Sequence, residues 1–207
     1  MMKLLHLQIE YYNNIIDLYA SLRTITVLYY TDNMKNQYEL QELQYRDSVR
    51  RLFQLNSKQR FLNGSPWHAA YIYEAMLKYL QLPCHENKQD MLKIFCRDLN
   101  PSVFNIPFLK DLIIQNKDKV QIIIQSSQDD LDIDYFDKIK DRCLFATKEF
   151  ERIKQIKYNF ATRGSAFRFE PSRDTVCAVA SANEDNTAVM LREEFDRYWQ
   201  ELSRDKA

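Results

Sequence analysis

The chain has 207 residues, 45% of them apolar and 13% aromatic, so it can bury one sizeable core and is too apolar to be disordered throughout. Its 29 basic and 29 acidic side chains give a formal net charge of zero, which excludes a global electrostatic field that would attract nucleic acid or an anionic membrane. With only 2 glycines and 5 prolines, we expect long helices joined by few tight turns.

Residues 1–56 carry a helical pattern in two parts. Apolar residues recur at three-and-four spacing from Leu5 to Leu22, which marks one face of a helix. Residues 25–30 are β-branched and aromatic, so a buried strand is an alternative to the end of that helix. Residues 31–33 supply a break and a capping side chain for a second helix, which reaches Phe53. We predict an antiparallel helical hairpin over residues 1–56.

Tyrosines are unusually frequent in this predicted hairpin. Their number exceeds what one side of a two-helix unit can bury, and tyrosine is enriched where a protein surface meets a partner. The alternative is that the hairpin folds back on the rest of the chain and the tyrosines line that internal contact. The residues concerned are Tyr11, Tyr12, Tyr19, Tyr29, Tyr30, Tyr38 and Tyr45.

Residues 56–65 are polar and include Gly64, so the sequence predicts a linker there. Ser65 and Pro66 favour the start of a helix, because the serine hydroxyl can cap free backbone N–H groups and proline at the first position loses no needed hydrogen bond. The helix predicted from residue 67 to about residue 80 is apolar nearly all round, and we expect it to be buried on several sides.

From residue 91 the pattern alternates between short apolar runs and amphipathic segments, as in an α/β protein. Strands are predicted at residues 91–96 and 120–125 with a helix between them, an order that makes the two strands parallel. A helix after Asp185 closes the chain. We predict an α/β fold with a second domain over residues 65–207, and the remaining predicted strands are residues 143–146, 157–161, 166–169 and 175–180.

The sequence gives no metal or cofactor pattern. The four cysteines form no C-x-x-C pair, and with three histidines they fit no zinc site, so we expect reduced and mostly buried thiols. Residues 129–141 hold six aspartates, which we interpret as a solvated loop or helix edge. Metal binding there is the alternative, although the run lacks the glycine and terminal glutamate of a calcium loop.

The order of elements after residue 65 resembles one lobe of the phospholipase D superfamily. The residues that carry the resemblance are 155–162, Gln-Ile-Lys-Tyr-Asn-Phe-Ala-Thr, and 180–183, Ala-Ser-Ala-Asn. The signature of that family is H-x-K followed by four residues and an aspartate, then G-S-x-N on the following strand. Lys157, Ser181 and Asn183 stand at the matching positions, whereas Gln155 and Thr162 replace the histidine and the aspartate.

The resemblance implies a lobe that has lost its mechanism. The histidine of the family is the nucleophile that attacks phosphorus, and a glutamine amide cannot replace it. An anion could still be bound without turnover, by lysine and arginine beside hydroxyl and amide groups. In the alternative interpretation, Lys157 and Arg168 are ordinary strand residues that pair with Glu170 or reach solvent. The residues expected at a phosphate or anion site are Lys157, Arg168, Ser181 and Asn183.

Basic residues cluster twice along the chain. The first block could contact nucleic acid or an acidic partner, or it could be a solvated helix face; it comprises Arg46, Arg50, Arg51, Lys58 and Arg60. The second lies close to the degenerate motif and comprises Lys148, Arg152, Lys154, Lys157 and Arg163. His68 is expected to be a partly buried histidine bonded to a neighbour, since no nucleophile accompanies it.

We therefore expect a protein-interaction subunit with no catalytic activity, which contacts another protein through its tyrosine-rich N-terminal helices. The family resemblance implies a place in a multi-component bacterial assembly, including those of antiviral defence. The alternatives are a phosphodiesterase or nuclease with an altered site, and a simple nucleic-acid-binding module. Met1–Glu10 is too short and too polar for a signal peptide, and no stretch reaches the roughly 18 apolar residues of a spanning helix. We expect a cytoplasmic protein without membrane contact.

Overall fold

The structure is a computed structural model of the chain and describes residues 37–80, 91–146, 150–171 and 177–204. The chain divides into two units, Met1–Gln44 and Tyr45–Ala207, and the division falls earlier than the predicted domain end at residue 56. In the first unit the described residues, 37–44, are helical, as the sequence predicted for the second helix. The first helix of the predicted hairpin, and the alternative strand at residues 25–30, lie outside the described residues.

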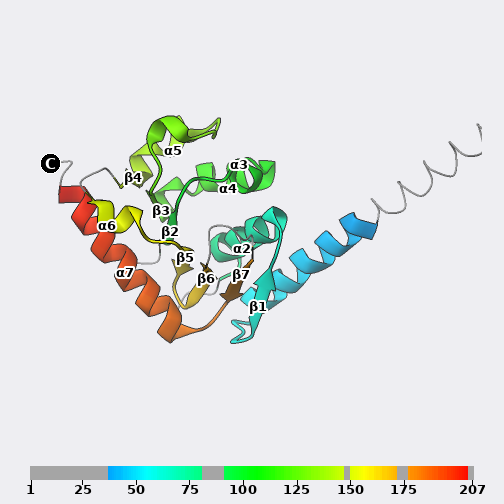
Figure 1. Cartoon of the computed structure of the whole chain (residues 1–207). Coiled ribbons are helices and arrows are strands. Elements are labelled where there is room, and N and C mark those ends of the chain that lie inside the picture. The colour runs from blue at the N-terminus through cyan, green and yellow to red at the C-terminus, as the bar shows by residue number, and fades with distance from the viewer. Residues whose placement is uncertain (1–36, 81–90, 147–149, 172–176, 205–207) are drawn as a thin grey trace, which may run out of the picture. The chain divides into compact units, whose positions relative to one another are not determined.

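The second unit contains a seven-stranded mixed sheet in the order β1-β7-β6-β5-β2-β3-β4 (Figure 1). Strands β2, β3 and β4 are parallel, β5 is antiparallel to β2, and β5, β6, β7 and β1 pair antiparallel in turn. The predicted α/β class and the predicted parallel pair are confirmed. The strands are β1 (Arg60–Asn63), β2 (Leu92–Cys96), β3 (Val120–Ile124), β4 (Cys143–Phe145), β5 (Asn159–Arg163), β6 (Ala166–Glu170) and β7 (Ala178–Ser181).

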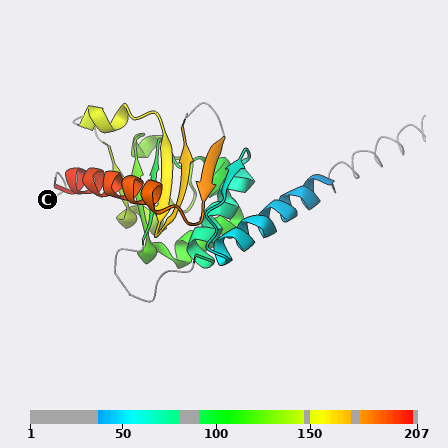
Figure 2. The same ribbon diagram turned by 90° about the horizontal axis from the view of Figure 1, so that it is seen from below.

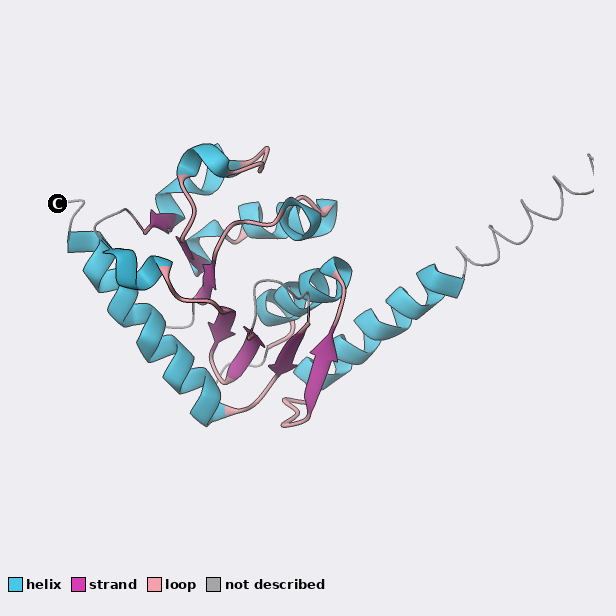
Figure 3. Ribbon diagram, in the orientation of Figure 1, coloured by secondary structure: helices cyan, strands magenta, loops and turns pink. Residues whose placement is uncertain are grey.

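Helices connect these strands and cover the sheet (Figure 3). The prediction of a capped helix after Ser65 is confirmed, since the Ser65 side chain accepts a hydrogen bond from the backbone N–H of His68. None of the helices in the described ranges is long and apolar enough to cross a membrane. Besides helical residues 45–54, the helices are α2 (Pro66–Lys78), α3 (Pro101–Phe104), α4 (Pro107–Gln115), α5 (Phe136–Ile139), α6 (Glu151–Lys154) and α7 (Asp185–Arg204).

The aspartate-rich run predicted as a loop or helix edge forms short helical turns, at Gln128–Asp130, α5 and Lys140–Arg142. Two of its carboxylates pair with lysines: Asp134 accepts from Lys110 Nζ at 2.6 Å and Asp137 from Lys140 Nζ at 3.2 Å. Within the described ranges, no group of three or more His, Cys, Asp or Glu side chains could hold a metal ion.

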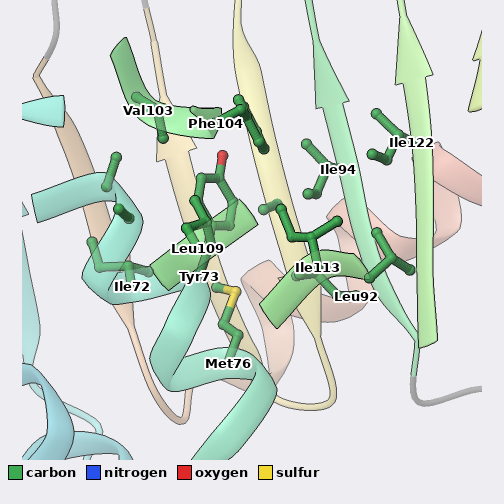
Figure 4. Close-up of a cluster of buried hydrophobic side chains, with 14 of the residues drawn as sticks. Ile72, Tyr73, Met76, Leu92, Ile94, Val103, Phe104, Leu109, Ile113 and Ile122 are labelled. Atoms are coloured by element: carbon green, nitrogen blue, oxygen red, sulfur yellow. The ribbon is translucent and has the colours of Figure 1, made fainter. Parts of the chain in front are cut away.

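The two faces of the sheet pack against different helices, because side chains alternate along each strand. Ile94 and Ile122 belong to a core cluster with α2, α3 and α4, and Figure 4 shows part of it. Phe95 and Phe160 point to the other face and pack, with rings 5.1 Å apart, in a second cluster with α7. Figure 2 shows α7 on one side of the sheet and α2, α3 and α4 opposite, while Ile153 of α6 belongs to the cluster of α7. The sheet is therefore the middle layer of three.

The linker predicted at residues 56–65 is wrong for residues 60–63, which form the edge strand β1 and pair with β7. Four residues with only two apolar side chains give too weak a pattern to reveal a strand, and the pairing with β7 decides the structure. Phe53, from helical residues 45–54, lies in the core cluster of α2 and meets Phe61 of β1 edge-on at 6.4 Å. Helical residues 45–54 therefore pack as part of the sheet-bearing unit.

Replacing Phe53 by alanine tests this packing. Phe53 is fully buried, so Phe53→Ala should lower the free energy of unfolding by about 3–5 kcal/mol through lost burial and a residual cavity. Leu55→Ala is the matched control, because Leu55 is 78% exposed and should change stability by less than about 0.5 kcal/mol. Urea denaturation followed by circular dichroism measures both. Equal losses for the two variants would contradict the packing.

Candidate functional site

A cavity of about 180 Å³ lies at the carboxyl end of β2, where the chain leaves the sheet towards α3. At β2 the sheet changes from parallel to antiparallel, since β3 runs with β2 and β5 against it. The ends of strands at such a change are open, because the connections diverge there and leave a crevice. Its wall is formed by Ala69, Tyr73, Cys96, Arg97, Asp98, Asn100, Val103, Phe104, Asn159, Arg168 and Glu170.

Arg168 of β6 is the most deeply buried charged group of the cavity, with 5% of its side chain exposed. It points to the same face as α2, where its guanidinium lies 5.8 Å from the centre of the Tyr73 ring. Its Nη1 donates to Glu170 Oε2 at 3.1 Å, while its Nε is buried and has no hydrogen-bond partner among the described residues. The predicted pairing of Arg168 with Glu170 is therefore confirmed, and one donor of the arginine is left over.

The rim of the cavity comes from the loop after β2 and from the start of β5. The backbone N–H of Arg97 donates to Asn159 Oδ1 at 3.0 Å, which ties the loop to β5. Asn100 Oδ1 accepts from the backbone N–H of Ser102 at 2.9 Å and so caps α3. Arg97, Asp98 and Asn100 are exposed at this rim, whereas Tyr73 is buried. The cavity thus has a buried arginine and tyrosine inside and mixed charges at its mouth.

The ionisable groups of the cavity favour binding over chemistry. Burial raises the pKa of Tyr73 to about 12, so its phenol stays protonated at neutral pH and can donate a hydrogen bond. Burial also raises the pKa of the Cys96 thiol well above its usual value, which removes the thiolate that a nucleophile needs. The described residues that line the cavity include no histidine. Within this part of the chain, the wall therefore offers no nucleophile with an adjacent base.

The structure does not bring the four predicted anion-site residues together. Lys157 is exposed and lies ahead of β5, at the end of the sheet where Asn159 pairs with Glu170. Ser181 pairs with Phe167, towards the other end of β6, and shares the sheet face of Phe167 rather than that of Arg168. Of the four residues, only Arg168 lines the cavity.

Asn183 and the two replaced motif positions also have structural contacts away from the cavity. Asn183 Nδ2 donates to the backbone carbonyl of Asn56 at 3.2 Å. Gln155 is exposed, with its Nε2 3.3 Å from Glu151 Oε1. The Thr162 hydroxyl is fully buried between the carbonyl oxygens of Ala166 and Ala188, at 3.1 and 3.3 Å. These positions therefore contribute nothing to the cavity.

Ion pairs occupy much of the first basic block. Arg46 donates from Nε and Nη2 to the Glu74 carboxylate at 2.9 and 2.7 Å, and Arg60 forms a two-pronged pair with Glu184. The Arg50 guanidinium lies 5.3 Å from the Tyr79 ring centre. Arg51 and Lys58 are exposed. The block therefore presents less free positive charge than its sequence indicates.

The second basic stretch is dispersed as well. Arg152 donates to Glu201 at 2.6 Å, and the buried Arg163 donates to the backbone carbonyl of Leu77 at 3.1 Å, near the end of α2. Lys148 lies outside the described residues. Arg163 thus serves the packing of α2 on the sheet and is withdrawn from any surface that could contact nucleic acid.

His68 has the neighbours that the sequence led us to expect. Its ring stacks on Tyr45 with centroids 3.6 Å apart, and the backbone N–H of Gly64 lies 3.5 Å from its Nδ1. The Tyr45 hydroxyl donates to the backbone carbonyl of Leu62 at 3.0 Å. Tyr45 therefore makes an internal contact, Tyr38 is 54% exposed, and the other five tyrosines named above lie outside the described residues.

Sequence reasoning missed most of the residues that line the cavity. Tyr73 and Arg97 stand in no motif, and Asn159 lies within residues 155–162 at a position to which the family signature gives no role. The three meet because α2, the loop after β2 and the start of β5 converge. One available signal was the predicted parallel strand pair, since ligands of open α/β sheets bind at the carboxyl ends of their strands. That rule points to the residues directly after Cys96, where Arg97, Asp98 and Asn100 follow.

The Arg46–Glu74 pair predicts a pH-dependent stability. Burial would raise the pKa of the Glu74 carboxyl, but the hydrogen bonds from Arg46 and Lys78 outweigh it and the pKa lies below its ordinary value. A carboxyl group whose pKa is lower in the folded state stabilises the fold at every pH above its unfolded-state pKa. This stabilisation is lost as the pH falls through the folded-state pKa. Arg46→Met should lower the free energy of unfolding by about 2 kcal/mol at pH 7. This loss is smaller than the ~3–5 kcal/mol expected when one partner of a fully buried ion pair is removed, because Lys78 still pairs with Glu74.

Urea denaturation of Arg46→Met and wild type between pH 7 and pH 3 measures this effect. The difference between the two should shrink as the pH falls, because a protonated Glu74 needs no cation. Arg51→Met is the control, since Arg51 is exposed and should change little at any pH. A stability difference independent of pH would show that Arg46 acts by packing alone.

The raised pKa of Cys96 predicts selective thiol labelling. Iodoacetamide at pH 7.5 should modify Cys177, which is exposed, and leave Cys96 and Cys143 unmodified, because both are buried. After denaturation all four cysteines of the chain, which include Cys84, should react. Mass spectrometry of tryptic peptides measures the difference. Rapid labelling of Cys96 in the folded protein would mean that the cavity exposes a reactive thiol.

Comparisons with known proteins leave the chain without an assigned family. No protein-family model matches it, no curated protein matches it, and no solved structure matches it. The phospholipase D resemblance therefore has only the residues of this chain to support it.

Proposed function

We propose that this chain is a non-catalytic, protein-binding subunit of a multi-component complex, built on a degenerate phospholipase D-like lobe. The observation that carries the proposal is the state of the motif positions. Gln155 stands exposed in place of the nucleophile, and Thr162 is bonded to two carbonyl oxygens inside the core in place of the aspartate. A lobe with these side chains has no group to form a phospho-enzyme.

Surface composition supports the part of the proposal that concerns a protein partner. On the described residues of the first unit, Tyr38, Leu40 and Leu43 are 54%, 56% and 54% exposed. Large apolar side chains gathered on one short exposed segment are typical of surfaces that another protein covers. By the same resemblance, the complex is a bacterial assembly, with antiviral defence as one setting. Independently of the resemblance, the proposed compartment is the cytoplasm.

The charge pattern is less favourable to the alternatives. A nucleic-acid-binding module needs cations free to neutralise phosphates, but Arg46 and Arg60 are paired with glutamates. A phosphodiesterase needs a nucleophile or a metal, and the cavity is lined by neither a histidine nor an ionised thiol. Both alternatives remain outcomes of the experiments below.

A tagged full-length chain, recovered from its native host, tests the proposed subunit. We expect a partner at fixed stoichiometry, identified by mass spectrometry and sized by light scattering. The triple variant Tyr38→Glu, Leu40→Glu, Leu43→Glu should lose that partner at least tenfold, because charge would have to be buried at the contact. Leu55→Glu is the control, since Leu55 is equally apolar and exposed but lies elsewhere in the chain.

Three results would contradict the proposal. The first is a monodisperse monomer that recovers no partner, and the second is a partner that both variants retain equally. The third is cleavage of bis(p-nitrophenyl) phosphate or of single-stranded DNA by the purified chain, which would identify it as an enzyme. DNA binding whose affinity falls steeply with salt would favour the nucleic-acid module instead.

A further inference from the structure

The cavity at the carboxyl end of β2 is balanced in charge. Its wall contains two guanidinium groups, Arg97 and Arg168, and two carboxylates, Asp98 and Glu170. A dianion such as free phosphate would gain from the arginines but would be repelled by both carboxylates. A cation would be attracted by the two carboxylates but repelled by the two arginines. The cavity is therefore matched to a ligand that carries one charge of each sign.

Arg168 provides the position for the negative end of such a ligand. Its side chain is 95% buried, yet no described residue accepts a hydrogen bond from its Nε, while Nη1 is already bonded to Glu170. A buried donor without a partner is costly, and an arginine edge fits the two oxygens of a carboxylate. The Tyr73 phenol beside it, held protonated by burial, offers a further donor at the same end of the cavity.

Glu170 provides the position for the positive end. Its carboxylate is 14% exposed and has Arg168 as its ion-pair partner, through a single contact at 3.1 Å. A carboxylate has room for several hydrogen bonds, so an ammonium group can join the arginine at Glu170 without displacing it. Asp98 stands at the rim of the same cavity and adds to the negative potential there.

The size and the remaining wall limit the ligand further. A volume of about 180 Å³ is well above the ~10–15 Å³ that one water needs and below the ~300 Å³ of a drug-sized pocket. The wall also includes apolar side chains from two helices, Ala69 of α2 with Val103 and Phe104 of α3. A small molecule with a short apolar branch fits these limits.

We propose that this cavity binds a free α-amino acid with a small or medium apolar side chain. Its carboxylate bonds to Arg168, its ammonium group bonds to Glu170, and its side chain contacts Val103 and Phe104. No bond is made or broken, so the chain acts as a receptor for the amino acid. The site is intact within the sheet-bearing unit and does not depend on a protein partner.

Isothermal titration calorimetry on the full chain tests the site with three probes that share a branched alkyl chain, and with inorganic phosphate. The three are L-leucine, 4-methylpentanoate and 3-methylbutylamine. Leucine should bind. Each analogue with only one of the two charged groups should bind at least tenfold more weakly, because either Arg168 or Glu170 would then lack a partner on the ligand. Phosphate should bind no better than 4-methylpentanoate. L-valine serves as a second amino acid of smaller size.

Two variants connect the binding to the residues. Glu170→Gln should weaken leucine binding at least tenfold while leaving 4-methylpentanoate binding unchanged or stronger, because only the ammonium contact is lost. Glu193→Gln on α7 is the control and should bind leucine as wild type does, since Glu193 does not line this cavity. Thermal melts check that both variants fold.

Three outcomes would overturn the proposal. The first is no binding of leucine or valine up to about 10 mM, a concentration above the ~1 mM scale of the weakest specific sites. The second is phosphate or 4-methylpentanoate binding as tightly as leucine, which would make the cavity a simple anion site. The third is unchanged leucine binding in folded Glu170→Gln. The comparison of probes on wild type decides the matter even if that variant does not fold.

Discussion

The structure depends most on strand β2, the strand at which the sheet changes direction. All five of its residues are buried, and it is hydrogen-bonded to parallel β3 on one side and to antiparallel β5 on the other. Phe95 faces α7, while Ile94 faces α2 and α4. Both cores therefore include this strand, and its carboxyl end opens the cavity because the chains on its two sides run in opposite directions.

Buried charged side chains attach the helices to this sheet, and their partners explain how the core tolerates them. Lys93, on the α7 face of β2, donates to both oxygens of Asp196 at 2.6 and 2.8 Å. Arg163 of β5 donates to a backbone carbonyl near the end of α2, and Glu74 of α2 accepts from Arg46 and Lys78. Such pairs contribute little net stability, but they fix which helix lies where, since a misplaced helix would leave a buried charge unpaired.

The sequence predicts the elements whose side chains carry strong local patterns. The strands β2 and β3 are short runs in which four of five residues are apolar, α2 has its Ser65–Pro66 start, and α7 has an apolar stripe, so local patterns reveal them. β1 was missed because its strand character comes from pairing with β7, and β5 begins two residues later than predicted. Arg168 and its pairing with Glu170 were predicted, but the other residues of the cavity wall were not grouped with them. Register and strand reversal, which no local pattern encodes, separate Arg168 from Lys157, Ser181 and Asn183.

The exposed Gln155 and the charge-balanced cavity beside Arg168 are consistent with one physical account. A catalytic site needs an accessible nucleophile. Its charged groups must also stabilise the charge that develops in the transition state more than they stabilise the bound substrate. Here the candidate thiol is buried and protonated, and opposite charges face each other across a small space. Such an arrangement suits a molecule that is bound but not activated. The Nε of Arg168, which has no hydrogen-bond partner within the described ranges, would gain one from an acceptor in the cavity. Binding would therefore remove the free-energy cost of a buried donor that lacks an acceptor. Because the ligand would bind only the folded state, occupancy of the cavity would stabilise the sheet-bearing unit against unfolding.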